Sequence, residues 1–223
     1  MSPTGTGLRR ALLVGALAAG WSGATVAGPP EAARPLTIPL RIRVALCPEK
    51  TDGPLRPVRA DPWLDEHLQA AEALLAPHGI GLRPVRETFT PSRCEALTRG
   101  ERDAFAAHLE PDHPGPTVLV VARVRDLDVP SYDLQGVHWR AGGKRWVFLT
   151  ARASPPTLAH EIGHYFGLGH DPKGGNLMTP GPSSPLWRSP RPPRPFAPRL
   201  TPAQAKKLRA AIAAQAAASE ARR

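Results

Sequence analysis

The sequence predicts a single domain of mixed α/β class, on the basis of its size, its order of elements and its lack of internal repeats. The chain has 223 residues and is 41% apolar, which is enough for one ordinary core and too little for two. Segments with the period of a strand are interspersed with segments with the period of a helix. The predicted order is strand, helix, two strands, a short strand, a strand and two helices.

The first predicted strand and helix lie near the start of the domain. Residues 36–46, LTIPLRIRVAL, alternate apolar and polar side chains as a half-buried strand does. Residues 61–79 place apolar side chains at helical spacing. We expect Asp61 to cap this helix, Pro62 to be its first residue and Gly79 to end it.

Four strands are predicted next. Residues 80–89 form one strand, and Pro84 within it indicates an edge position or a bulge. The continuous apolar run 116–124 is typical of a central strand covered on both faces. After a polar loop, residues 137–140 form a short strand, and residues 145–151 form the last one.

Two helices are predicted in the C-terminal third. Ser154 and the two prolines after it should cap and start one helix, and residues 201–218 should form the other. Between them, residues 180–199 are too rich in proline for a regular helix or a central strand. We interpret this segment as an extended connector and residues 219–223 as a basic tail.

The N-terminus has the pattern of a secretory signal peptide. Two arginines, Arg9 and Arg10, precede a short apolar run and small residues that lead to Ala27. We expect cleavage after residue 27, a short linker at 28–37, and a secreted or periplasmic protein that keeps no membrane insertion. A retained N-terminal anchor is the alternative.

The formal net charge of the full chain is +10. The basic residues are spread along the chain without a Lys/Arg block, and only 5% of residues are aromatic. We therefore expect no nucleic-acid partner.

The segment HEIGHYFGLGHD contains three histidines and a glutamate that suit a catalytic metal site. On a helix, His160 and His164 lie on the same face, and a turn at Gly167 would bring His170 to the same point. Three imidazoles leave one tetrahedral position open, which is typical of catalytic zinc. Glu161 would act as general base and acid toward a water on that ion. Surface histidines, or a metal site without catalysis, are the alternatives.

This pattern, HExxHxxGxxH, resembles the zinc signature of the metzincin metalloproteases, and Met178 in NLMTP resembles their Met-turn. The resemblance implies a zincin-like catalytic domain over residues 38–218, with a mostly parallel sheet, an antiparallel edge strand and an active-site helix. It also implies that a peptide or protein substrate pairs antiparallel with the edge strand 137–140, and that the segment after the Met-turn walls the pocket.

The subfamily stays unassigned. Asp171 resembles the adamalysin pattern, while the small size resembles the matrixins. Pro180 occupies the position where some metzincins carry a tyrosine ligand, which disfavours that subgroup.

The two cysteines, Cys47 and Cys94, should form a disulfide if the protein is exported. The alternative is that one of them is a free thiolate that binds the metal and holds the enzyme latent.

The remaining acids and histidines are weaker candidates. Asp126, Asp128 and Asp133 form either a Ca²⁺ site or a solvated loop. None of the other histidines has ligand spacing, and we interpret them as surface residues, with His138 nearest to the cleft: His67, His78, His108, His113 and His138.

The sequence therefore predicts an exported, monomeric zinc endopeptidase. The alternative is a catalytically silent metal-binding or surface-adhesion module that uses its basic, proline-rich segment.

Overall fold

The computed structural model describes residues 35–50, 52–171, 175–180 and 198–222. The chain divides into two units, Met1–Ala33 and Arg34–Arg223, and every described residue belongs to the second unit. The predicted signal peptide lies outside the described residues, as do residues 181–197 of the proline-rich segment. In the described part, no helix is long and apolar enough to cross a membrane.

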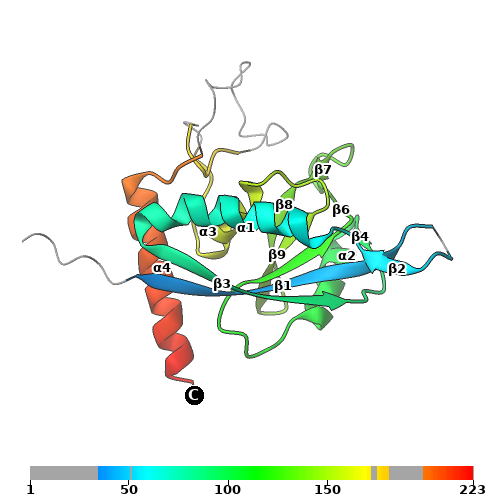
Figure 1. The fold of residues 1–223 in the computed structure, drawn as a ribbon, viewed down its shortest axis with the longest axis horizontal. Helices are drawn as coiled ribbons and strands as arrows, with labels where there is room; N and C mark the ends of the chain where they lie inside the picture. Colours follow the sequence, from blue (N-terminus) through cyan, green and yellow to red (C-terminus); the bar gives the residue numbers. More distant parts are fainter. Residues whose placement is uncertain (1–34, 51, 172–174, 181–197, 223) are drawn as a thin grey trace, which may run out of the picture. The chain divides into compact units, whose positions relative to one another are not determined.

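A mixed sheet forms the centre of this unit (Figure 1). The long strand β1 pairs with β2, β3 and β5, and the order continues through β9 to β8. β3, β1, β5 and β9 are mutually parallel, while β8 is antiparallel to β9 and ends the order. This confirms the predicted mostly parallel sheet with an antiparallel edge strand. The bounds are β1 Leu36–Pro48, β2 Leu55–Pro57, β3 Ile80–Phe89, β5 Thr117–Val121, β8 Gly136–Ala141 and β9 Lys144–Thr150.

The predicted strand 116–124 is in fact two strands in two sheets. The chain leaves the main sheet at Ala122, whose backbone N–H donates to the carbonyl of Cys94. The second piece, β6, joins a small sheet of order β4-β6-β7, so the prediction of one continuous strand was wrong. The bounds of this small sheet are β4 Glu95–Ala96, β6 Arg123–Arg125 and β7 Asp133–Leu134.

The helices are α1 Asp61–Leu75, α2 Arg99–Ala104, α3 Thr157–Tyr165 and α4 Pro202–Glu220, with 3₁₀ turns at Ala76–His78 and Phe105–His108. Thr201 and Gln204 form a capping box at α4, as the prediction of a cap there required. Gly79 takes φ +66° where the α1 segment ends. Two predicted caps are wrong: Ala60 precedes α1 without a side-chain cap, and the Ser154 hydroxyl bonds Gln135 Oε1.

Apolar side chains fill both faces of the main sheet. The first core cluster packs the sheet against α1, α3 and α4, and the second packs the other face around Phe105, which follows α2. In β5, Val118 and Val120 belong to the first cluster, while Leu119 belongs to the second. Successive side chains of a strand point to opposite faces, so β5 is the doubly covered central strand that its apolar run predicts.

His67 on α1 is buried against the loop that precedes α3. Its side chain is 1% exposed, and its two ring nitrogens lie 2.7 Å from the carbonyl oxygen of Trp63 and 3.1 Å from that of Ala153. The prediction of a surface histidine was therefore wrong at this position, because α1 turns that face toward the core.

Candidate metal centre

Helix α3 presents two histidines on one face. His160 and His164 are separated by one turn, and their Nε2 atoms lie 2.9 Å apart. Leu158, Ala159 and Ile162 on the helix are fully buried against the sheet, which fixes the rotation of the helix about its axis. The packing that forms the core therefore also aims the two imidazoles.

The third histidine reaches the same point through a tight turn. Gly167 has φ +87°, a left-handed conformation that costs other residues free energy. The N–H groups of Gly167 and Leu168 donate to the carbonyls of His164 and Gly163, which close the end of the helix. His170 Nε2 then lies 3.0 Å from His164 Nε2. Within the described residues, these three histidines are the group of potential ligands that converges on one point.

Two backbone carbonyls determine which ring nitrogens carry protons. His160 Nδ1 lies 2.7 Å from the carbonyl oxygen of Leu177, and His164 Nδ1 lies 2.8 Å from that of Leu168. A carbonyl oxygen only accepts, so each neutral ring protonates Nδ1 and presents a bare lone pair at Nε2. A hydrogen bond between the two Nε2 atoms would need a proton that these tautomers lack.

The arrangement fits a zinc ion. Two lone pairs that face each other at 2.9 Å repel unless a cation lies between them. Ligand atoms on a tetrahedral zinc with its usual bonds to histidine lie about 3.3 Å apart, close to the spacings found here. Burial lowers the pKa of each of the three histidines, that of His164 to about 3, so the rings are neutral at pH 7 as metal binding requires.

Glu161 follows the first histidine and lies against the edge strand β8. Its side chain is buried, and burial raises the pKa of its carboxyl to about 8, against the lowering effect of a hydrogen bond from the His138 backbone. Oε2 has no hydrogen-bond partner among the described residues. A buried carboxyl with one vacant oxygen is suited to take up and release a proton.

Gly136 makes room for this carboxyl. A Cβ atom at Gly136 would lie 2.8 Å from Cγ and 3.1 Å from Oε1 of Glu161, and 2.8 Å from Cγ2 of Thr157. Real Cβ contacts essentially never fall below 3.0 Å, so a larger residue at position 136 would force the Glu161 side chain to move. Sequence reasoning missed Gly136, although a glycine that begins a strand is a signal of close approach.

Met178 packs against helix α3. It is fully buried, and its Sδ lies 2.7 Å from the position that a Cβ at Gly163 would take. Gly163 is therefore a second glycine that sequence reasoning missed. The predicted Met-turn residue is thus found directly under the turn of α3 that carries His160 and His164.

Asn176 ties the Met-turn to its surroundings. Its side chain accepts from the backbone N–H of Met178 at 2.8 Å and donates to Asp171 Oδ2 at 2.6 Å. The backbone N–H of Asp171 also donates to the carbonyl of Met178. The turn therefore holds both the first ligand, through Leu177, and the chain that follows the third ligand, His170.

The other predicted site residues lie away from the histidines. Cys47 and Cys94 form a disulfide, which contradicts the alternative of a free thiolate at the metal. Asp126 Oδ1 accepts from two backbone N–H groups of its own turn, while Asp133 forms ion pairs with Arg123 and Arg152. In the described part of the chain, these acids do not converge with Asp128 on one point, so calcium binding stays a prediction without a ligand set.

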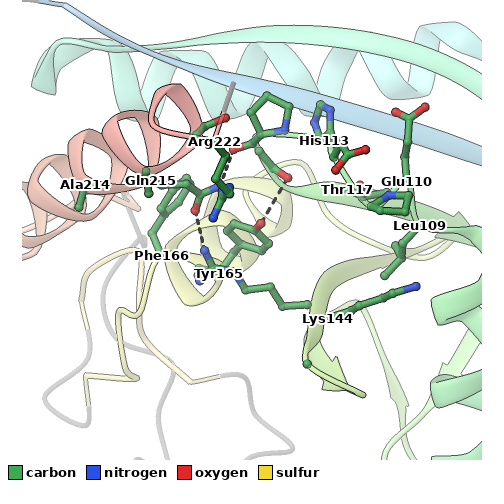
Figure 2. Close-up of a pocket in the computed structure, with 18 of the residues that line it drawn as sticks. Leu109, Glu110, His113, Thr117, Lys144, Tyr165, Phe166, Ala214, Gln215 and Arg222 are labelled. Atoms are coloured by element: carbon green, nitrogen blue, oxygen red, sulfur yellow. Dashed lines mark hydrogen bonds between the residues drawn. The ribbon is translucent and has the colours of Figure 1, made fainter.

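A pocket of about 1240 Å³ lies at the C-terminal end of α3, between α4 and the loop that precedes β5 (Figure 2). Tyr165 projects into it and donates from its hydroxyl to the carbonyl of Gly115. Its lining includes neither Glu161 nor the three histidines, and it mixes acids with bases. The pocket is therefore distinct from the candidate metal centre.

Comparison with known proteins finds similar folds among solved structures. No protein-family model and no curated protein matches the chain. A crystal structure of metalloproteinase-II from Bacteroides fragilis is similar with a TM-score of 0.52 and 18% identity, over 82% of this chain and 55% of that one. The crystal structure of archaemetzincin from Methanopyrus kandleri is similar with a TM-score of 0.52 and 15% identity, over 79% of this chain and 96% of that one.

The chain shares its fold with these two proteins. It spans about half of the Bacteroides chain and nearly all of the archaeal one. Neither structure is described as a matrixin or an adamalysin, so the comparisons support neither of these subfamilies.

Proposed function

We propose that this chain is an exported zinc-dependent endopeptidase of metzincin type. The observation that carries the proposal is the convergence of three imidazoles, two of which are held by backbone carbonyls in the tautomer that binds metal. The similar folds of a metalloproteinase and an archaemetzincin support it. The disulfide between Cys47 and Cys94 is consistent with export, because such bonds persist in oxidising compartments.

In this proposal, His160, His164 and His170 hold one zinc ion. When bound, zinc would supply Lewis-acid activation of water and of the peptide carbonyl. The charge of a bound zinc ion would lower the raised pKa of Glu161, so that its carboxylate accepts a proton from the attacking water and then delivers it to the leaving amine. Its buried position, with Oε2 unpaired among the described residues, keeps the carboxyl free for this exchange.

The substrate pairs with the outer edge of β8. β8 ends the strand order of the main sheet, so within the described residues one row of its backbone groups has no partner strand. An extended peptide added antiparallel to that edge would satisfy those groups. Gly136 on β8 lies against Glu161, so we expect the scissile bond near the start of the strand.

The test is a comparison of wild type with Glu161→Gln on a mixed peptide library. The wild type should bind one zinc, cleave internal peptide bonds, lose activity on chelation and regain it with zinc. Glu161→Gln should retain the zinc and lose activity by at least about 100-fold, because the amide cannot accept the proton.

A zinc-loaded wild type that cleaves nothing would instead support a silent metal-binding module. Cleavage that survives Glu161→Gln would contradict the assigned role of the carboxyl.

A further inference from the structure

Two arginines, one on the edge strand β8 and one on its neighbour β9, have no counter-ion among the described residues. Arg140 on β8 lies directly opposite Arg145 on β9. Like charges in opposite positions of two strands repel each other. This repulsion destabilises the strand pair unless an anion binds beside the two guanidinium groups.

The partners of these two arginines are neutral or absent among the described residues. Arg145 donates to the carbonyl of Tyr165 at 3.0 Å and to Gln215 Oε1 at 2.6 Å, and its guanidinium lies over the Tyr165 ring. Arg140 is exposed, and in the described part of the chain it has neither a hydrogen bond nor an ion pair. Both positive charges lie close enough to His138 to lower its pKa.

Among the described residues, no acid forms an ion pair with either arginine. Asp103 already accepts from the indole N–H of Trp139, on the opposite face of β8, and Asp133 pairs with Arg123 and Arg152. The sequence also has no acidic residue between Asp171 and Glu220, which includes the whole proline-rich segment.

Arg140 faces the side of the sheet on which Glu161 lies. Alternate residues of a strand share a face, and Gly136 on that face contacts the Glu161 side chain. His138, two residues further, packs its ring against Tyr165 of α3, at 5.8 Å between centroids. Arg140 is the next residue on this face, and it is the exposed one.

We propose that the enzyme selects peptides with an acidic residue on the amino side of the scissile bond, recognised by Arg140. This rests on the proposed function, because it assumes that a peptide pairs antiparallel with β8. In that pairing, the residue opposite Arg140 lies four positions N-terminal to the residue opposite Gly136. Side chains in such cross-strand positions lie about 5 Å apart, within reach of an ion pair.

The test uses sets of peptides that are identical except for Glu, Gln or Lys at one position from two to six residues before the cleaved bond. With the wild type, kcat/KM should be highest for Glu and lowest for Lys at one of these positions. The ratio of Glu to Gln should be about two- to fivefold, as for an exposed ion pair, and should shrink in high salt.

Three substitutions test whether the preference for Glu comes from Arg140. Arg140→Gln should abolish the preference, Arg140→Glu should reverse it toward Lys, and Arg140→Lys should largely retain it. The control is Arg83→Gln. Arg83 is also exposed, but it lies on β3, which pairs with β1 and is not the proposed substrate edge. This control should leave the preference unchanged.

The outcomes separate this inference from the proposed function. A wild type that cleaves none of the peptides, although it is zinc-loaded, would overturn both. A wild type that cleaves without regard to charge, or a preference that persists in Arg140→Glu, would overturn the role of Arg140 alone.

Discussion

His160 Nδ1 lies 2.7 Å from the carbonyl oxygen of Leu177, the residue that precedes Met178. This contact joins the first of the proposed zinc ligands to a segment that follows it by 17 residues in the chain. Because the carbonyl sets the ring's tautomer and orientation, the metal affinity should depend on how rigidly this segment is held.

Asn176→Ala tests this dependence. The substitution removes the acceptor for Met178 N–H and the donor to Asp171, so the Leu177 carbonyl loses its support. Zinc affinity should fall about 10- to 100-fold, measured by competition with a chelating dye. The matched control is Gln204→Ala, which removes the donor to Asn176 Oδ1 and the capping bond from Thr201 N–H but leaves the Asn176 side chain in place. Gln204→Ala should lower stability and leave zinc affinity near wild type; equal affinities in Asn176→Ala and wild type would refute the argument.

Gly136→Ala tests the placement of the Glu161 carboxyl, the proposed general base. The new Cβ would lie 2.8 Å from Glu161 Cγ and from Thr157 Cγ2, so the side chain of Glu161 must move. We expect kcat to fall by up to about 100-fold while zinc content stays at one per chain, because the atoms nearest to the new Cβ belong to Glu161 and Thr157 and not to the histidines.

The control for this substitution is Gly100→Ala on α2, where a Cβ would meet nothing within 4 Å. It should retain wild-type activity. If kcat in Gly136→Ala also matched wild type, Glu161 would not depend on its contact with β8.

The features that could be predicted from the sequence are those that local spacing determines. His160 and His164 share a face because they are four residues apart on a helix, and Gly167 provides the left-handed turn toward His170. The mixed sheet followed from strand patterns and from the metzincin resemblance, and the structure confirms it.

The rest depends on contacts between distant parts of the chain, which periodicity does not show. Gly136 is needed only because Glu161 approaches it, and Gly163 only because Met178 packs beneath it. Asn176 looks like an ordinary turn residue until its side chain is seen between the Met-turn, Asp171 and α4. His67 was assigned to the surface because one helix alone does not reveal what packs on it.

His138 should make stability depend on pH. Burial, together with the charges of Arg140 and Arg145, lowers its pKa from 6.5 to about 4 in the folded protein. Between these two values the unfolded chain binds more protons than the folded chain, so the free energy of unfolding decreases as the pH falls from 6.5 to 4. At pH 7 the ring is neutral in both states, and this contribution is fully present.

The comparison is urea unfolding of metal-free wild type and His138→Phe at pH 7 and pH 5. Phenylalanine keeps the ring contact with Tyr165 and does not titrate. The wild type should lose more stability between the two pH values than the variant does, because only the wild type has the His138 ring to protonate. The contribution of the three site histidines is common to both proteins and cancels in the comparison. An equal loss in the two proteins would show that His138 protonates without cost in the fold.

The Cys47–Cys94 disulfide should stabilise the fold without affecting the metal centre. Cys47 lies at the end of β1 in the main sheet, and Cys94 precedes β4, so the bond connects the two sheets across 47 residues of chain. Closing a loop of this length limits the freedom of the unfolded chain, and its removal typically costs about 2–4 kcal/mol. The double variant Cys47→Ala/Cys94→Ala should therefore show a lower free energy of unfolding in urea by that amount.

Its zinc content and kcat should match wild type below its unfolding transition, because neither cysteine belongs to the histidine cluster. Loss of zinc from the folded double variant would instead indicate that the small sheet supports the metal centre.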